Sequence, residues 1–131
     1  MIRAKKSLGQ NFLIDREVLE KITNVVQIKD KTILEVGPGT GNLTSFILKK
    51  NPKKMFVIEK DDDLAINLSE TFKDQLTIIN DDILQVDENL IFKNKVTVFG
   101  NLPYNISTEI LSKWIPKTKD EFWFNNQILM F

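Results

Sequence analysis

Polar residues that could bind or activate a substrate follow four apolar runs of this 131-residue chain. The four groups are Glu35 with the turn Gly37-Pro38-Gly39-Thr40-Gly41, Glu59, Asp82 with Ile83, and Asn101-Leu102-Pro103-Tyr104. Glycine can take positive φ and lie against a ligand that a Cβ would push away, so the turn is the candidate cofactor cradle.

Asn101 and its neighbours could activate an amine. Pro103 stiffens the segment, which can then hold the Asn101 amide oxygen and the Leu102 carbonyl oxygen in fixed directions. Two acceptors that grip the hydrogens of an exocyclic adenine amine favour its pyramidal form and free its lone pair for attack on an electrophilic methyl group. Tyr104 offers a face on which the base can stack. A plain Asn-Pro-type turn is the alternative interpretation.

The two carboxylates between these segments fit a nucleoside. Glu59 lies 18 residues beyond Gly41, where an acid can accept hydrogen bonds from both ribose hydroxyls. Asp82 can accept from an adenine amine while Ile83 packs on the ring, and Asp81 takes that role if the register shifts by one. An acidic pair that caps a short helix explains the same residues equally well.

The elements that must position these groups alternate between strands and helices. Apolar runs predict strands over 32–36, 55–58, 76–79, 95–99 and 127–131. Helical spacing predicts a helix that ends near Gln27, with Asp15 as its candidate N-cap, a second helix capped by Asn42 and a later one capped by Ser107 or Thr108. Another helix is predicted after the apolar run 55–58, with Asp61, Asp62 and Asp63 crowding its favourable N-terminus. This pattern predicts an α/β, doubly wound, Rossmann-like sheet of about five parallel strands, with ligands at their carboxyl ends.

Composition removes several classes of chemistry. The chain has no cysteine and no histidine, which excludes thiolate nucleophiles, a histidine base and the usual zinc sites, so we expect no metal. No apolar run approaches the ~20 residues of a membrane span, and a cytoplasmic protein without a membrane partner is expected. The 18 basic residues balance 18 acidic ones, so net charge gives no argument for a polyanionic partner.

The glycine turn differs from the fingerprint of dinucleotide-binding enzymes. Asn42 stands where a dinucleotide fingerprint has its third glycine, which speaks against a nicotinamide-dependent dehydrogenase. A βα unit can also use one or two glycines for close helix packing alone.

Taken together, the motifs resemble those of the ribosomal RNA adenine N6-dimethyltransferases, the KsgA-type family of S-adenosylmethionine enzymes. The matching segments, in the family's order, are Leu8-Gly9-Gln10-Asn11-Phe12-Leu13, Glu35 to Gly41, Glu59, Asp82-Ile83 and Asn101 to Thr108. The glycine motif is shared by many methyltransferases, whereas the pair Gln-Asn-Phe-Leu and Asn-Leu-Pro-Tyr is narrow.

The resemblance implies a role for each residue. Gln10, Asn11 and Leu13 would close over S-adenosylmethionine, Gly37 and Gly39 would pass its methionine end, and Asn101 would lie between the cofactor and the target base. Glu59 would bind the ribose, Asp82 and Ile83 the cofactor adenine, and Asn101, Leu102 and Tyr104 the target adenine. Family members dimethylate two adjacent adenosines near the 3′ end of 16S ribosomal RNA, so the implied partner is the immature small ribosomal subunit.

Two other functions share this scaffold. Macrolide-resistance methyltransferases modify 23S ribosomal RNA and commonly show Asn-Ile-Pro-Tyr, so Leu102 favours the small-subunit enzyme. Transcription factors on the same fold indicate a non-catalytic nucleic-acid-binding alternative. Relatives run to roughly twice this length, so residues 1–131 are expected to be an incomplete methyltransferase domain without the C-terminal helical domain.

Overall fold

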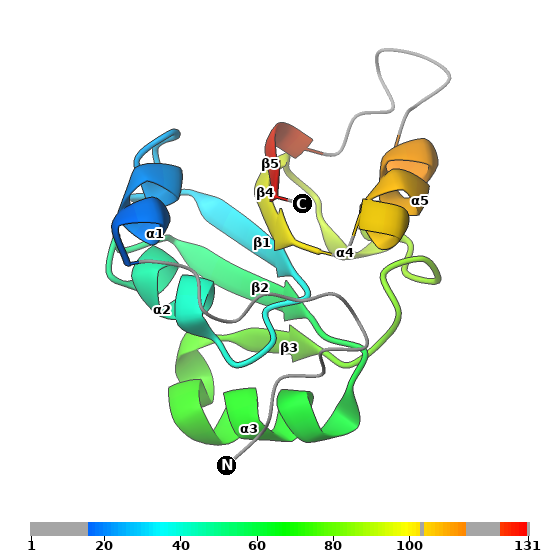
Figure 1. Ribbon diagram of the computed structural model, residues 1–131, viewed down its shortest axis with the longest axis horizontal. Coiled ribbons are helices and arrows are strands. Elements are labelled where there is room, and N and C mark those ends of the chain that lie inside the picture. The colour runs from blue at the N-terminus through cyan, green and yellow to red at the C-terminus, as the bar shows by residue number, and fades with distance from the viewer. Residues whose placement is uncertain (1–15, 103, 115–123, 131) are drawn as a thin grey trace.

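A five-stranded parallel sheet forms the centre of the molecule in a computed structural model that describes residues 16–102, 104–114 and 124–130 (Figure 1). The strands are β1 (Thr32–Val36), β2 (Lys54–Ile58), β3 (Thr77–Ile79), β4 (Val96–Asn101) and β5 (Phe124–Met130). Their order is β3-β2-β1-β4-β5 and all pairs are parallel. The order reverses between β1 and β4, so a ligand site is expected at the carboxyl ends of these two strands. The predicted doubly wound sheet is confirmed.

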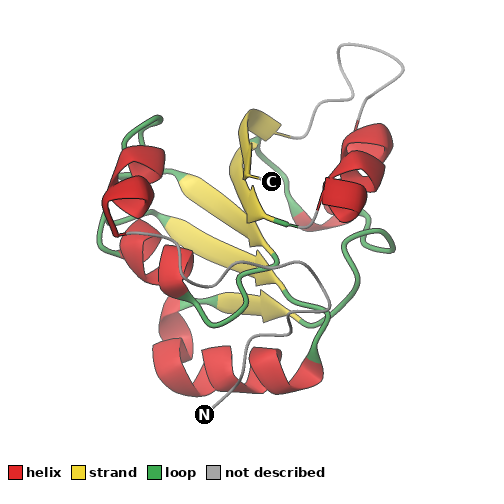
Figure 2. Cartoon of the chain, in the orientation of Figure 1, coloured by secondary structure: helices red, strands yellow, loops and turns green. Residues whose placement is uncertain are grey.

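Helices cover both faces of the sheet (Figure 2). They are α1 (Arg16–Thr23), α2 (Asn42–Leu48), α3 (Asp62–Phe72), α4 (Glu88–Ile91) and α5 (Tyr104–Trp114), with a 3₁₀ turn, η2, over Lys73–Gln75. The first three pack on one face, against β-strand side chains such as Ile33 and Val57. Helix α5 packs on the other face, where Ile110 and Trp114 contact Leu34 and Val98.

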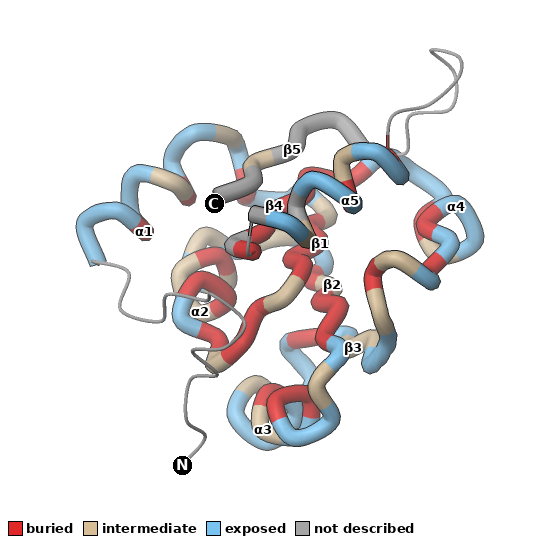
Figure 3. The backbone as a smooth tube through the Cα atoms, turned by 45° about the vertical axis from the view of Figure 1, so that its right-hand side comes forward, coloured by how far each residue is buried: buried red, intermediate tan, exposed pale blue. Residues whose placement is uncertain are grey.

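Alternation along the strands explains the two cores. Successive side chains of a strand point to opposite faces, so Ile33 belongs to one apolar cluster and Leu34 to the other. Both are fully buried, as expected for parallel strands covered on two sides. Figure 3 shows the buried backbone running through the sheet and exposed residues on the outer turns of the helices.

Helix α1 ends four residues before the predicted end at Gln27. The Thr23 hydroxyl donates to the carbonyl oxygens of Leu19 (2.9 Å) and Glu20 (3.1 Å), and the chain then turns. The run Thr23-Asn24-Val25-Val26 consists of residues with low helix propensity, which is why the apolar spacing misled the prediction. Asp15, the predicted N-cap, lies outside the described residues.

Two of the predicted N-caps are wrong. Gly41, at φ +92°, is the N-cap of α2 and its carbonyl oxygen accepts the first helical bond, from Ser45 N at 2.9 Å, so Asn42 is already helical. Helix α5 begins at Tyr104, ahead of the predicted caps Ser107 and Thr108. Ser107 and Thr108 are favourable cap residues by type, but the helix begins at least three residues earlier, so side-chain preference alone does not decide where it starts. The predicted crowding of Asp61, Asp62 and Asp63 at the N-terminus of α3 is confirmed, and Asp61 is its N-cap, with a carboxylate that accepts from Leu64 N at 3.0 Å.

The last two strands are longer than predicted. β4 continues through Gly100 to Asn101, which pairs with Met130, so Asn101 closes the strand rather than starting a loop. β5 starts at Phe124, three residues before the predicted Gln127. A register shift opposite Val96 and Thr97 accommodates the asparagines that follow Phe124, residues that disfavour a regular strand.

Candidate active site at the carboxyl ends of the strands

The glycine turn after β1 is built on left-handed backbone. Gly37, Gly39 and Gly41 have φ of 66°, 60° and 92°. A Cβ on Gly41 would stand 2.7 Å from the Phe72 ring, so this glycine allows α2 to pack closely on α3. Gly37 N donates to Ile58 O at 2.9 Å, which ties the start of the turn to the end of β2. The turn is therefore held in place on both sides.

Glu59 fixes the middle of that turn. Its side chain is buried at the end of β2. Oε1 accepts from Gly39 N at 3.1 Å and Oε2 accepts from Asp61 N at 3.0 Å. A carboxylate offers about four acceptor positions, so these two backbone bonds do not saturate it. Glu59 thus supports the cradle as well as presenting acceptors at the strand end, a structural role that sequence reasoning did not predict.

Glu35, in β1, is a buried acid with a matched partner. Its side chain is 1% exposed and Oε1 accepts a hydrogen bond from the Thr44 hydroxyl on α2. Burial raises the pKa of Glu35 from 4.5 to about 8, against a lowering effect of the Thr44 bond and with a further raising effect of the Glu59 charge. At neutral pH the Glu35 carboxyl is therefore largely protonated beneath the turn.

The end of β3 lies beside the end of β2. Asn80 Nδ2 donates to Glu59 O at 2.9 Å, and Lys60 Nζ is 3.5 Å from Asp82 Oδ2. Asp82 Oδ1 accepts from Leu84 N at 3.0 Å, so Asp82 also stabilises its own turn, as the alternative interpretation held. Ile83 is buried, 7% exposed, at the start of the segment that leads to α4.

The segment after β4 contacts the glycine turn. Leu102 is buried, and a Cβ on Gly37 would stand 2.6 Å from Leu102 Cδ2. The structure thus brings the backbone that follows Asn101 against the turn that follows Glu35. The side chains of Asn101 and Tyr104 lie outside the described part of the structure.

Gln10, Asn11 and Leu13 also lie outside the described residues. Within residues 16–102, 104–114 and 124–130, no three His, Cys, Asp or Glu side chains are grouped to hold a metal ion. Over the same ranges, no helix is long and apolar enough to cross a membrane.

Comparison with protein families identifies this arrangement. The family model described as ribosomal RNA adenine dimethylase matches residues 1–131. The chain belongs to the ribosomal RNA adenine dimethylase family.

Individual proteins agree with this family. A "Ribosomal RNA small subunit methyltransferase A" of Pelagibacter ubique is 65% identical over 130 residues, which cover 99% of this chain and 50% of that protein. The chain therefore spans about half the length of the curated relatives it matches. Among solved structures, a dimethyladenosine transferase of Plasmodium falciparum has a TM-score of 0.69 at 28% identity and covers 92% of this chain and 42% of its own. The 23S rRNA methyltransferase ErmE has a TM-score of 0.69 at 26% identity, covering 79% of this chain and 42% of its own.

In this dimethylase-family chain, a cluster around Lys113 and Glu88 was not predicted from the sequence. Lys113 Nζ, on α5, donates to the carbonyl oxygens of Ile83 and Val86 and to Glu88 Oε2 at 2.8 Å. Trp114 Nε1 donates to the same Glu88 oxygen at 3.0 Å. The helix that follows the Asn101 segment therefore holds the segment that contains Ile83. A lysine and a tryptophan side by side on a helix give no such signal in a sequence, because their partners lie 25 to 30 residues away.

Proposed function

We propose that this chain is the cofactor-binding part of an S-adenosylmethionine-dependent ribosomal RNA adenine N6-dimethyltransferase. The proposed substrate is the pair of adjacent adenosines near the 3′ end of 16S ribosomal RNA in the immature small subunit, in the cytoplasm. Family membership and the 65% identical small-subunit relative support this substrate over others.

One contact carries the proposal. Methyl transfer requires the methyl donor and the acceptor amine to meet, and Leu102 packs directly on Gly37. Leu102, which directly follows Asn101, is thereby held against the proposed cofactor turn. A methyl group above this turn and an amine at the end of β4 would be neighbours.

The residues at the strand ends fit S-adenosylmethionine. The cofactor, when bound, supplies an electrophilic methyl group on a cationic sulfonium. Buried Glu59 and partly buried Asp82 place acidic groups beside the turn, which suit a cation, whereas Glu35 beneath it is largely protonated at neutral pH and would add its charge only on ionisation. Glu59 presents acceptors for ribose hydroxyls and Asp82 for an adenine amine. The Asn101 side-chain oxygen and the Leu102 carbonyl oxygen would orient the target amine and polarise its N–H bonds.

The ribose role of Glu59 is tested by pairing a mutation with a ligand change. Glu59→Ala should weaken S-adenosylmethionine binding in calorimetry. Because Glu59 also supports Gly39 and Asp61, the same titration with a 2′,3′-dideoxy analogue of the cofactor is the control. Removing the hydroxyls should cost wild type far more affinity than it costs Glu59→Ala. Equal costs in the two proteins would contradict the ribose contact.

The role of Asn101 is tested by activity. Asn101→Ala in the full-length protein should abolish methyl transfer to immature small subunits and leave cofactor affinity nearly unchanged. Undiminished turnover would contradict the amine-gripping role, and RNA binding without any transfer by wild type would indicate the non-catalytic alternative.

The likeness to the ErmE structure makes 23S ribosomal RNA the second candidate substrate. Mapping the labelled adenosines after incubation with both ribosomal RNAs separates it from the 16S substrate.

A further inference from the structure

The lysines of this chain gather at one edge of the sheet. The segments that enter β1, β2, β3 and β4, residues 29–31, 49–54, 73–74 and 93–95, contain nine lysines and two aspartates. The segments that leave β2 and β3 at the opposite edge, residues 59–63 and 80–82, contain six acids and one lysine. The balanced net charge therefore hides a separation of charge between the proposed catalytic edge and the edge formed by the four entering segments, here called the amino-end edge.

The amino-end edge is preformed. Asp30 N donates to Asn51 O at 3.1 Å and Lys53 N donates to Lys31 O at 2.8 Å, so the segments before β1 and β2 are joined by their backbones. The side chains of Lys31 and Lys53 are exposed. Lys50 is already engaged, by Asn24 at 2.8 Å and Glu20 at 3.6 Å. The exposed lysines would accept a polyanion without rearrangement of the backbone.

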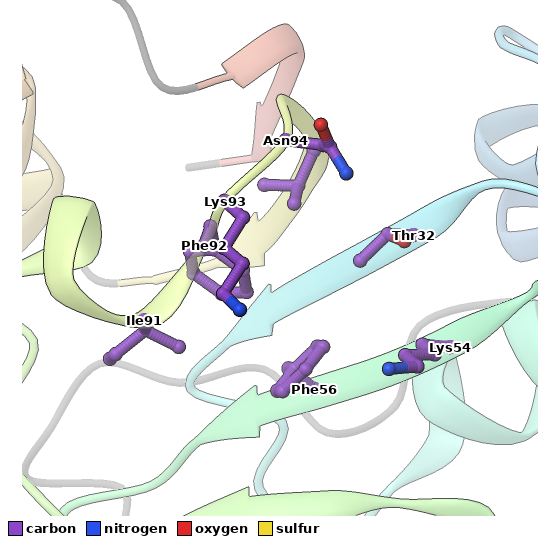
Figure 4. A pocket seen from close by; sticks show the side chains of 8 residues that line it. Thr32, Lys54, Phe56, Ile91, Phe92, Lys93 and Asn94 are labelled. Carbon is purple, nitrogen blue, oxygen red and sulfur yellow. The ribbon is translucent and has the colours of Figure 1, made fainter.

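A cavity of about 280 Å³ opens within this edge (Figure 4). Its lining comes from the N-terminal halves of β1, β2 and β4, from the last residue of α4 and from the segment after α4: Thr32, Lys54, Phe56, Ile91, Phe92, Lys93, Asn94 and Val96. Figure 4 shows Phe56 on β2 facing the segment that carries Phe92 and Lys93. The centroids of the two phenylalanine rings lie 5.1 Å apart, edge to face, with Phe56 half-buried and Phe92 buried in the core below, so the rings form the apolar floor of the cavity.

The composition of this cavity is that of a single-stranded nucleic-acid site. Basic side chains follow the phosphates in such sites, and aromatic side chains support unstacked bases. Lys54 and Lys93 flank the phenylalanines, both are exposed, and within the described part of the chain neither forms an ion pair. Asn94, also exposed, adds an amide that can pair with a base edge.

We infer that the amino-end edge is a second RNA-binding surface, on which Lys54, Lys93 and their neighbours contact phosphates and the Phe56–Phe92 cavity receives one unstacked base. The inference rests on the proposed function, because it gives the RNA substrate its second contact. An RNA at the acidic carboxyl ends gains little attraction there from its phosphates, so its electrostatic attachment must come from another surface. A five-residue strand is about 17 Å long, so the two edges are close enough for one RNA that passes around the sheet to contact both.

The first test measures salt dependence. Fluorescence anisotropy follows binding of a labelled single-stranded RNA to the full-length protein, to Lys54→Gln/Lys93→Gln and to the control Lys60→Gln, whose exposed lysine lies at the carboxyl-end edge. Each lost phosphate contact should make the slope of log K against log salt shallower by about 0.7. The double variant should thus bind about 25-fold more weakly at 0.1 M salt, whereas Lys60→Gln should match wild type.

Three results would overturn the proposal that the amino-end edge binds RNA. They are an unchanged slope in the double variant, an equal change in Lys60→Gln, or displacement of the RNA by polyglutamate at the same charge concentration. The last would indicate an acidic protein partner. Thermal unfolding of each variant checks the fold, since exposed lysine substitutions should alter stability by no more than about 0.5 kcal/mol.

The second test places the RNA directly. A photoreactive benzoylphenylalanine at Asn94 should crosslink to the RNA, and the same group at Ile66, exposed on α3, should not. Crosslinks at both positions or at neither would contradict the site. Binding is measured without methyl transfer, so RNA binding at this edge by a protein that transfers no methyl group would refute the proposed function alone. Methyl transfer with no loss of RNA affinity in the double variant would refute the surface alone.

Discussion

Glu35 should make the stability of this protein fall as the pH rises. Burial raises the pKa of Glu35 from 4.5 to about 8, so between these values the folded state holds a proton that the unfolded state has lost. The stabilisation by the protonated carboxyl is complete below pH 4.5 and is lost as the pH rises through 8. One pKa unit corresponds to about 1.4 kcal/mol, and the free energy of unfolding should fall by about 5 kcal/mol across the window.

Glu35→Gln removes this dependence. Glutamine keeps a side-chain oxygen that can accept from the Thr44 hydroxyl, and it carries no charge at any pH. The variant should be about as stable as wild type near pH 5 and several kcal/mol more stable near pH 8. Urea unfolding at a series of pH values measures the difference. Glu70→Gln, an exposed position on α3, is the matched control and should run parallel to wild type.

Parallel curves for wild type and Glu35→Gln would refute the reasoning. They would mean that the Glu35 carboxyl ionises in the folded state as easily as in water, so that burial and the Glu59 charge do not disfavour its anion. A Glu35→Gln curve that falls relative to wild type as the pH rises would also refute it, because it would show that the Glu35 anion stabilises the fold.

Three further outcomes follow from the site. Binding of the cationic cofactor should favour the Glu35 carboxylate and release a proton near pH 7, seen by calorimetry in buffers of different ionisation enthalpy; Glu35→Gln should release none. Gly37→Ala should destabilise the fold by about 1 to 3 kcal/mol because Gly37 has left-handed backbone. Adding Leu102→Ala to Gly37→Ala should recover only the part of this loss that comes from the clash of the new Cβ with Leu102 Cδ2. A double-mutant cycle in urea measures that part. Lys113→Met leaves the Glu88 carboxylate buried without its cation and should cost about 3 kcal/mol. Adding Glu88→Gln should restore most of that loss, and no recovery would show that the lysine acts through the carbonyl oxygens alone.

The existence of the strands and their order along the chain could be predicted from the sequence, and the bounds of β1 with them. β1 was predicted with its observed bounds, because a short β-branched run between a lysine and a glycine has one plausible interpretation. The positive φ of the three turn glycines also follows from local rules. The roles of Gln10, Asn11, Leu13, Glu59, Asp82, Ile83, Asn101 and Tyr104 toward a ligand stay predictions.

Contacts between distant segments could not be predicted. The Thr44 hydroxyl reaches Glu35 only because α2 packs over β1, and the carboxylate of Glu59 reaches Gly39 only because β2 lies beside β1. The predictions of the helix ends were wrong for a related reason. Gly41 replaced Asn42 as the N-cap because the geometry of the turn, rather than the preference of one side chain, decides where the helix begins.

The distribution of charged residues over the fold could not be predicted from the net charge. Equal numbers of basic and acidic residues give no reason to expect a polyanionic partner when they are summed over the chain. In a parallel sheet, however, every segment that enters a strand lies at one edge and every segment that leaves a strand lies at the other. Lysines before strands and acids after them therefore become two opposed surfaces. The proposed methyltransferase would benefit from this separation, since the acids would attract a cationic methyl donor at the site of transfer while the lysines of the proposed surface would hold the polyanionic RNA elsewhere.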